Sequence, residues 1–160
     1  MNKADQVRIA VQELRLVRSA RMGPVYFHGE TMRPFLGEGD LVIVEPVAWE
    51  DIRLGDVLTY RFEDKFPTRR VVAIDREGQT VILHGDSIPG RPDYTVKRED
   101  VLGRAVARER NGVRVDRHSR EWRWATRRVL AAHRVARLAS ACSWRVRKLR
   151  SRIDPILRLP

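Results

Sequence analysis

The sequence predicts a mainly β fold of the β-rich α+β class, with a helix before it and a basic helical tail after it. Between about residues 25 and 115, short runs of β-branched and aromatic residues alternate with turn sequences. On both sides of this region, apolar residues recur instead at helical spacing. A chain of 160 residues suffices for one compact domain with an appendage, so we divide it into residues 1–22, 23–115 and 116–160.

The first segment is predicted to form an amphipathic helix that ends at Met22-Gly23-Pro24, where glycine and proline interrupt the pattern. We expect this helix to pack on the body; the alternative is a docking helix for a partner. One helix of this length is too small to be a helix-turn-helix DNA-binding unit. Its apolar positions are Val7, Ala10, Val11, Leu14 and Val17.

The middle segment contains six runs typical of strands, separated by turn sequences such as GEGD, LGD and DREGQ. Arg110-Asn111-Gly112-Val113 is typical of a tight hairpin turn after the last run. Regularly spaced strands without a long helical pattern between them predict a barrel or sandwich-like domain. The runs are residues 25–29, 41–47, 57–63, 68–74, 80–85 and 101–109.

The C-terminal segment carries the whole net charge of the chain, +11. Residues 117–160 contain 13 Lys+Arg against 2 Asp+Glu, whereas residues 1–116 contain 19 of each kind. Apolar residues at helical spacing predict a basic amphipathic helix, with Trp122, Trp124 and Trp144 as amphipathic anchors. It is either a solvated helix covering part of the body or a contact with an anionic membrane surface or partner protein. Nucleic acid is disfavoured, because no base-reading module accompanies the arginines.

Composition argues against several classes of protein. The first twenty residues are charged throughout, unlike a signal peptide, and no apolar run approaches the roughly 18–20 residues of a membrane span. Cys142 is the only cysteine, which excludes an internal disulfide and a cysteine-based metal cluster. We expect a cytoplasmic protein without a cofactor, and the basic tail allows peripheral attachment to the inner face of the membrane.

Three boxes of the middle segment fit together: GETMRPFLGEGDLVIVEP (29–46), GDVLTYRFEDKFPTRRVVAI (55–74) and HGDSIPGRPDYTVKREDVLGRAV (84–106). Their order, spacing and Gly-Asp pairs resemble the signal-peptidase superfamily, which includes signal peptidase I and the self-cleaving domains of phage and SOS repressors. The resemblance covers roughly half of the chain and implies a coiled-sheet domain. It also implies serine-peptidase chemistry: a hydroxyl attacks a peptide carbonyl, a neutral lysine or histidine takes the hydroxyl proton, and backbone N–H groups stabilise the oxyanion.

Two positions depart from the pattern that the resemblance implies. Thr31 occupies the place of the nucleophilic serine, and Arg69 occupies the place of the lysine or histidine base. Threonine keeps a hydroxyl but adds a methyl group beside the reacting oxygen. Arginine, with a pKa above about 12, stays protonated and cannot act as the general base, a role commonly worth about 10²–10⁴ in rate. We therefore expect an inactive or repurposed site in preference to an active one.

Three other residues are candidates for a replacement base. His84 ranks first, because the late Gly-Asp box approaches the active site in the family. His28 lies three residues before Thr31, and Lys65 lies four residues before Arg69, on the same strand face if no bulge intervenes.

In the family, the strip that contains Met32 and Pro34 lines a groove for an extended peptide, so we expect a peptide or precursor protein as a partner. Asp86 is expected to support the site or a turn rather than to act directly. Three interpretations stay open. The chain is a signal-peptidase-like protein with a degenerate catalytic pair, an active endopeptidase that uses Thr31, or a non-catalytic peptide-binding or scaffold module that docks to a partner or membrane surface.

Overall fold

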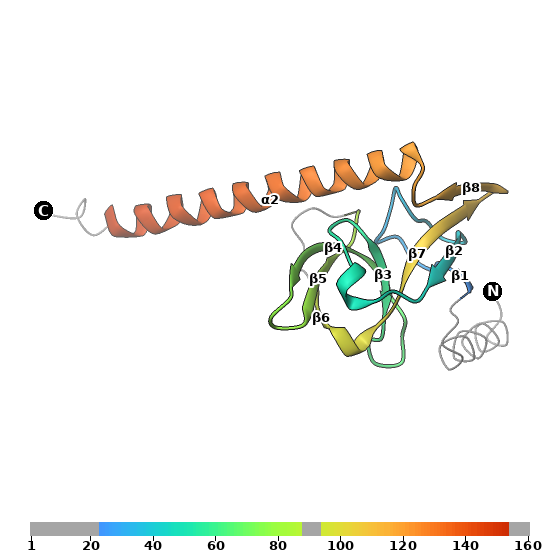
Figure 1. The fold of residues 1–160 in the computed structure, drawn as a ribbon. Coiled ribbons are helices and arrows are strands. Elements are labelled where there is room, and N and C mark those ends of the chain that lie inside the picture. Colours follow the sequence, from blue (N-terminus) through green and yellow to red (C-terminus); the bar gives the residue numbers. More distant parts are fainter. Residues whose placement is uncertain (1–22, 88–93, 154–160) are drawn as a thin grey trace, which may run out of the picture.

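The computed structural model describes residues 23–87 and 94–153, which form a curled antiparallel sheet with a long helix beside it (Figure 1). The strands are β1 (Pro24–Tyr26), β2 (Leu41–Glu45), β3 (Val57–Tyr60), β4 (Thr68–Asp75), β5 (Thr80–His84), β6 (Tyr94–Lys97), β7 (Val101–Arg110) and β8 (Val113–Asp116). Short 3-10 turns occupy Trp49–Asp51 and Arg98–Asp100, and helix α2 runs over Arg120–Ile153. The mainly β class and the C-terminal helix are confirmed, whereas the predicted helix of residues 1–22 lies outside the described residues.

The strand order in the sheet is β1-β2-β7-β3-β4-β5-β6, and β8 pairs with β7 outside this order. Each of the six predicted runs contains a strand of this sheet. The hairpin predicted at Asn111-Gly112 joins β7 to β8, and both residues have the positive φ that this turn requires, 52° and 76°. Strand β6 was missed, because only Val96 of its four residues is buried and no alternation is long enough to recognise.

The sheet is covered on both faces at its centre. All four residues of β3 are buried. Because successive side chains of a strand point to opposite faces, Val57 belongs to one core cluster and Leu58 and Tyr60 belong to another. The first cluster also contains Phe35 and Trp122, so it lies between the sheet and the start of α2.

Two of the Gly-Asp pairs close tight turns before a strand. Gly39 and Gly55 have φ values of +81° and +87°, in the left-handed region that favours glycine. The following carboxylates, Asp40 and Asp56, accept hydrogen bonds of 2.9 and 3.0 Å from backbone N–H groups three residues earlier. The glycine therefore supplies the backbone conformation, and the aspartate satisfies a donor within the turn.

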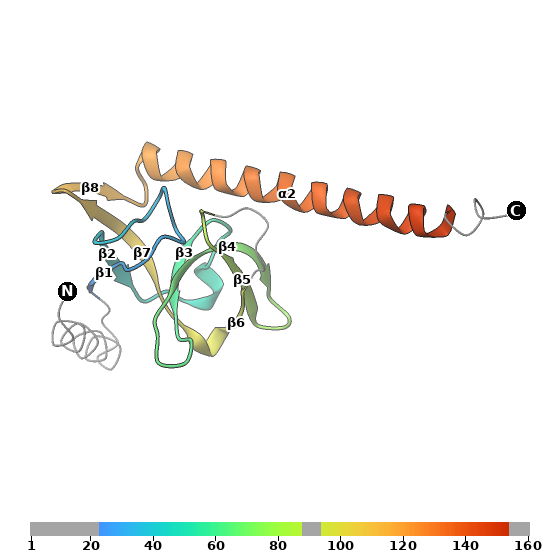
Figure 2. The same cartoon turned by 180° about the vertical axis from the view of Figure 1, so that it is seen from behind.

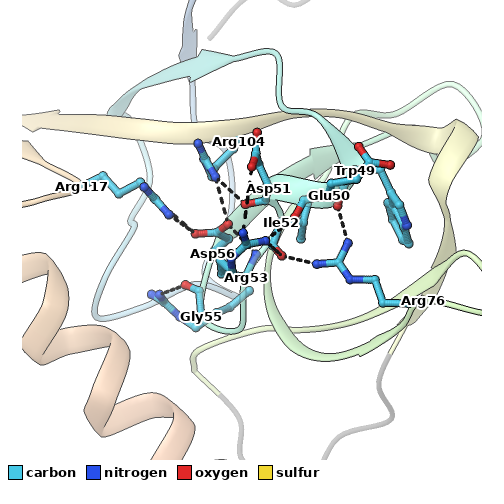
Figure 3. A network of polar contacts seen from close by, with 11 residues as sticks. Trp49, Glu50, Asp51, Ile52, Arg53, Gly55, Asp56, Arg76, Arg104 and Arg117 are labelled. Atoms are coloured by element: carbon cyan, nitrogen blue, oxygen red, sulfur yellow. Dashed lines mark hydrogen bonds and ion pairs between the residues drawn. The ribbon is translucent and has the colours of Figure 1, made fainter.

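Arginines that are distant in the chain fasten these two turns to the sheet. Arg110 places two nitrogens at 2.7 Å from the carboxylate of Asp40. Figure 3 shows Arg104 and Arg117 converging on the buried carboxylate of Asp56, at 3.3 and 2.8 Å. The turns that precede β2 and β3 are thus tied to β7 and to the segment that leads into α2.

Helix α2 begins at Arg120, where the Ser119 hydroxyl accepts a hydrogen bond of 3.1 Å from the N–H of Trp122. Trp122 is 3% exposed and packs edge-to-face on Phe35, with ring centroids 4.7 Å apart. One turn later the helix lies so close to the body that a Cβ on Gly55 would stand 2.3 Å from Cγ2 of Thr126. The later turns of α2 extend beyond the body, as Figure 2 shows from the opposite side.

Candidate functional site

Thr31 and Arg69, 38 residues apart in the chain, lie in direct contact. Thr31 is in the turn segment between β1 and β2, and Arg69 is the second residue of β4. Nη1 of Arg69 donates a hydrogen bond of 2.6 Å to Oγ1 of Thr31 and another of 3.0 Å to the carbonyl of Thr68. Both residues are half-buried. The two positions singled out in the sequence therefore form one site.

The chemistry of this contact follows from the charge of arginine. A guanidinium stays protonated at any physiological pH, so Arg69 can donate to the Thr31 hydroxyl but cannot take its proton. The hydroxyl accepts from Arg69 and keeps its own hydrogen for donation. The pair therefore presents hydrogen-bond donors and a positive charge, which suits an acceptor or an anion better than it suits proton abstraction.

The third box packs on the backbone of Thr31. The N–H and the hydroxyl of Ser87 both donate to the Thr31 carbonyl, each at 3.0 Å. A Cβ on Gly85 would lie 2.6 Å from the same oxygen, so only glycine fits there without a shift. The glycine of the third Gly-Asp pair, Gly85, therefore allows its backbone to pack closely on the backbone of Thr31. All three boxes meet at Thr31 and Arg69.

Asp86 pairs with the neighbouring arginine of the β4 box. Nε and Nη2 of Arg70 donate to the two carboxylate oxygens of Asp86 at 2.8 and 2.6 Å, and both side chains are 0% exposed. Nη1 of Arg70 donates to the carbonyl of Gly55 and to the hydroxyl of Thr126, each at 2.9 Å. Asp86 therefore holds the buried guanidinium of Arg70, and Arg70 links the third box to α2.

The role of Arg70 is a feature that the sequence reasoning missed. Arg69 and Arg70 are adjacent on β4, so their side chains point to opposite faces of the sheet. Arg69 reaches Thr31, while Arg70 is fully buried with its guanidinium 4.7 Å from the centre of the Phe35 ring. The signal was present in the doublet itself, because two consecutive charged residues inside an apolar strand cannot both face solvent.

A groove of about 400 Å³ adjoins Thr31 and Arg69. Its walls come from the edge strand β1 with the segment after it, from β2, and from the turn that leads into β4. Its lining combines apolar side chains with polar and charged ones. The lining residues are Val25, Tyr26, Phe27, His28, Gly29, Thr31, Val42, Val44, Asp64, Lys65, Phe66, Pro67, Thr68 and Arg69.

Two of the candidate replacement bases lie along this groove. Nδ1 of His28 is 2.8 Å from Oε1 of Glu38. The hydrogen bonds from His28 and from the N–H of Gly29 lower the pKa of the Glu38 carboxyl, which stabilises its charged form. Lys65 is exposed in the turn before β4, where its backbone pairs with Phe62. Among the described residues, neither side chain makes a hydrogen bond to Thr31.

His84 does not line the groove. It is 4% exposed and belongs to a second cavity, of about 320 Å³, which lies beneath α2. Its ring centroid is 4.8 Å from that of His133 on α2, at an interplanar angle of 55°. The box that contains His84 does approach Thr31, through Gly85 and Ser87. The side chain of His84, however, points to the α2 side.

Met32 and Pro34 also lie away from the groove beside Thr31, which corrects the sequence-based expectation. Met32 is 0% exposed and belongs to the core cluster of Phe35 and Trp122. Pro34 is exposed and lines the cavity beneath α2 instead. The strip turns inward directly after Thr31, so its apolar residues build the core, while β1 and the β3–β4 turn build the groove.

No group of three His, Cys, Asp or Glu side chains within residues 23–87 and 94–153 is placed to hold a metal ion. Over the same residues, no helix combines the length and the apolarity that a membrane span requires. Comparison with known proteins found no matching family model and no matching curated protein.

Proposed function

We propose that this chain is a signal-peptidase-like module that binds extended peptides without cleaving them. The observation that carries the proposal is the 2.6 Å hydrogen bond from Arg69 to the hydroxyl of Thr31. A hydroxyl nucleophile needs a partner that accepts its proton, and a guanidinium is a permanent donor. Thr31 and Arg69 are in hydrogen-bonding contact, but Arg69 cannot accept the hydroxyl proton of Thr31.

Peptide binding is supported by the groove beside this pair. Strand β1 stands at the edge of the sheet, and exposed edges accept an extended peptide as an added strand. The groove runs from β1 to the turn before β4 and reaches Thr31 and Arg69. An extended chain lying in it would pass its backbone over β1 and its side chains over Val42, Val44 and Phe66.

The competing function is an active endopeptidase that uses Thr31. It needs a neutral base within hydrogen-bonding reach of Oγ1, directly or through one water molecule. Among the described residues, the side chain that hydrogen-bonds Oγ1 is Arg69, which is charged and is a donor. His28, the nearest histidine in the chain, is engaged with Glu38.

The test separates binding from cleavage. The full chain is incubated with randomised peptides; bound peptides are recovered by affinity selection, and products are sought by mass spectrometry. We expect binding without cleavage for the native chain, and cleavage by the double variant Thr31→Ser with Arg69→Lys, with Arg61→Lys as the control on an exposed arginine. Native cleavage that is lost in Thr31→Ala would overturn the non-catalytic proposal.

Helix α2 supports a second proposed contact, with an anionic membrane surface. Its later turns extend past the β body (Figure 1), within the segment that holds the net charge of the chain. Trp124 is 59% exposed, and the guanidinium carbon of Arg128 lies 4.6 Å from the centroid of the Trp124 ring. An exposed tryptophan beside arginines is typical of a helix that lies in a lipid headgroup layer. The protein would then be cytoplasmic and peripheral.

A further inference from the structure

We propose that the groove recognises the C-terminal carboxylate of its peptide, and that Arg69 and Thr31 are the residues that bind it. This inference rests on the proposed peptide-binding function and goes further, because it names the chemical group that is bound. Its starting point is the set of hydrogen-bond donors that remain unused at the Thr31 end of the groove.

Arg69 has donors to spare. Nη1 is occupied by Thr31 and by the carbonyl of Thr68, whereas Nε and Nη2 have no hydrogen-bond partner among the described residues. Thr31 accepts from Arg69, and its own hydroxyl hydrogen has no acceptor among the described residues either. These groups are all donors, so a ligand that satisfies them must bring acceptor oxygens.

The donors are held in place before any ligand arrives. Two hydrogen bonds fix Nη1, and the guanidinium carbon lies 5.6 Å from the centre of the Tyr94 ring. A planar guanidinium with two free N–H groups on one side matches the two oxygens of a carboxylate. Because the side chain is already oriented, binding loses little side-chain entropy.

The charges along the groove favour an anion. Arg69 and Lys65 are positive and make no ion pair among the described residues, while Asp64 is the one acid in the lining. The carboxylate of Glu38, which is outside the lining, lies 2.8 Å from Nδ1 of His28. With Lys65 and Arg69 against Asp64, the groove lining therefore carries a net positive charge.

The acceptor is either the terminal carboxylate of the peptide or an acidic side chain, and we commit to the terminus because every peptide carries one whatever its sequence. Gly85 and Ser87 lie directly against the carbonyl of Thr31, and neither of them lines the groove. The third box therefore contacts Thr31 from outside the groove lining. A peptide that lies along β1 with its terminal carboxylate beside Thr31 would satisfy the free donors of Arg69.

The experiment compares randomised hexapeptides, labelled with fluorescein at the N-terminus, in three pools. One pool has free C-terminal carboxylates, one has C-terminal amides, and one has C-terminal amides with glutamate as the last residue. Fluorescence anisotropy measures their binding to the native full chain and to Arg69→Gln, Arg69→Lys and Arg61→Gln. Arg61 is an exposed arginine outside the groove, so its variant is the control for charge.

We expect the native chain to bind the free-acid pool about tenfold or more tightly than the amide pool, as for hydrogen bonds to a charged group. Arg69→Gln should remove this difference between the acid and amide pools, Arg69→Lys should keep part of it, and Arg61→Gln should keep all of it. Equal binding of acid and amide by the native chain would overturn the inference alone. So would a glutamate amide pool that binds as tightly as the free acids. Failure of every pool to bind would overturn the peptide-binding function itself.

Discussion

The guanidinium of Arg69 donates a 2.6 Å hydrogen bond to the hydroxyl of Thr31. This contact joins the two positions at which the sequence departs from the pattern of a serine peptidase. Both residues line the groove, and both have N–H or O–H groups that this contact leaves available for donation. A site arranged for proton abstraction would hold a neutral acceptor at the place of the guanidinium.

Asp86→Asn is expected to destabilise the fold by about 3–5 kcal/mol, because it leaves the buried Arg70 without its counter-charge. Urea unfolding followed by tryptophan fluorescence measures the change. The matched control is Asp116→Asn in the exposed pair with Arg114, at 59% and 57% exposure, where about 0.5 kcal/mol or less is expected. Equal effects of the two substitutions would contradict the structural role of Asp86.

Gly85→Ala is expected to cost about 1–3 kcal/mol of stability, because its Cβ would press on the carbonyl of Thr31, a backbone atom that cannot swing aside. It should also weaken peptide binding through the displacement of Thr31. Gly37→Ala is the control: its Cβ would meet only the side chains of Arg110 at 3.5 Å and Arg33 at 3.8 Å, both ordinary contacts. A Gly85→Ala protein with native stability and native peptide binding would be the opposing result.

Asp40 makes the stability depend on acid pH. Burial raises the pKa of its carboxyl, but the hydrogen bonds from Arg110 and the Gly37 N–H together outweigh burial and bring the pKa below its ordinary value. Because the folded pKa is the lower one, the stabilisation is complete above the unfolded value, near about 3.9, and is lost as pH falls through the folded value. Asp40→Asn should lose about 1.5–3 kcal/mol at neutral pH, and the difference from the native chain should shrink below about pH 4.

Chemical unfolding of both proteins from pH 7 down to about pH 2.5 measures this difference, and the acid limb lies in the range where aspartates titrate. A difference in unfolding free energy that stays constant over the whole series would argue against an ionised Asp40 as the partner of Arg110.

The two tryptophans at the start of α2 are expected to behave differently. Trp122→Ala should cost about 3–5 kcal/mol, because this side chain is 3% exposed and packs on Phe35. Trp124→Ala should change stability by about 0.5 kcal/mol or less, because that side chain is 59% exposed. Thermal or urea unfolding of the two variants is the measurement. Similar losses would mean that α2 docks through a different face.

Vesicle binding tests the proposed membrane contact. The full chain should co-sediment with vesicles containing phosphatidylglycerol at low salt, and should not do so with pure phosphatidylcholine or at high salt. Neutralising three arginines of α2 should weaken binding by about 3 kcal/mol, at about 1 kcal/mol per charge. Neutralising three basic residues of the β domain should have little effect. Vesicle binding that does not change with salt concentration would refute the proposal. The α2 variant replaces Arg127, Arg134 and Arg137 with glutamine, and the control replaces Arg61, Lys97 and Arg114.

Most of the secondary structure was predictable because it depends on short-range patterns. The six strand runs, the Asn111-Gly112 hairpin and the basic C-terminal helix each have a local signal of apolar spacing or turn chemistry. Strand β6 has no such signal, since one buried residue in four makes no pattern. It is held in the sheet by its pairing with β5, which is a long-range interaction.

The same division holds for the site. The hydroxyl at Thr31, the arginine at Arg69 and the three Gly-Asp pairs are visible in the chain, because residue type and order are sequence properties. Which arginine of the doublet reaches Thr31 and which is buried with Asp86 depends on the faces of β4 and on the register with β3 and β5. Met32 lies in the core and His84 faces α2 because of tertiary packing. Burial of apolar surface outweighs the local conformational preferences of the chain at these positions.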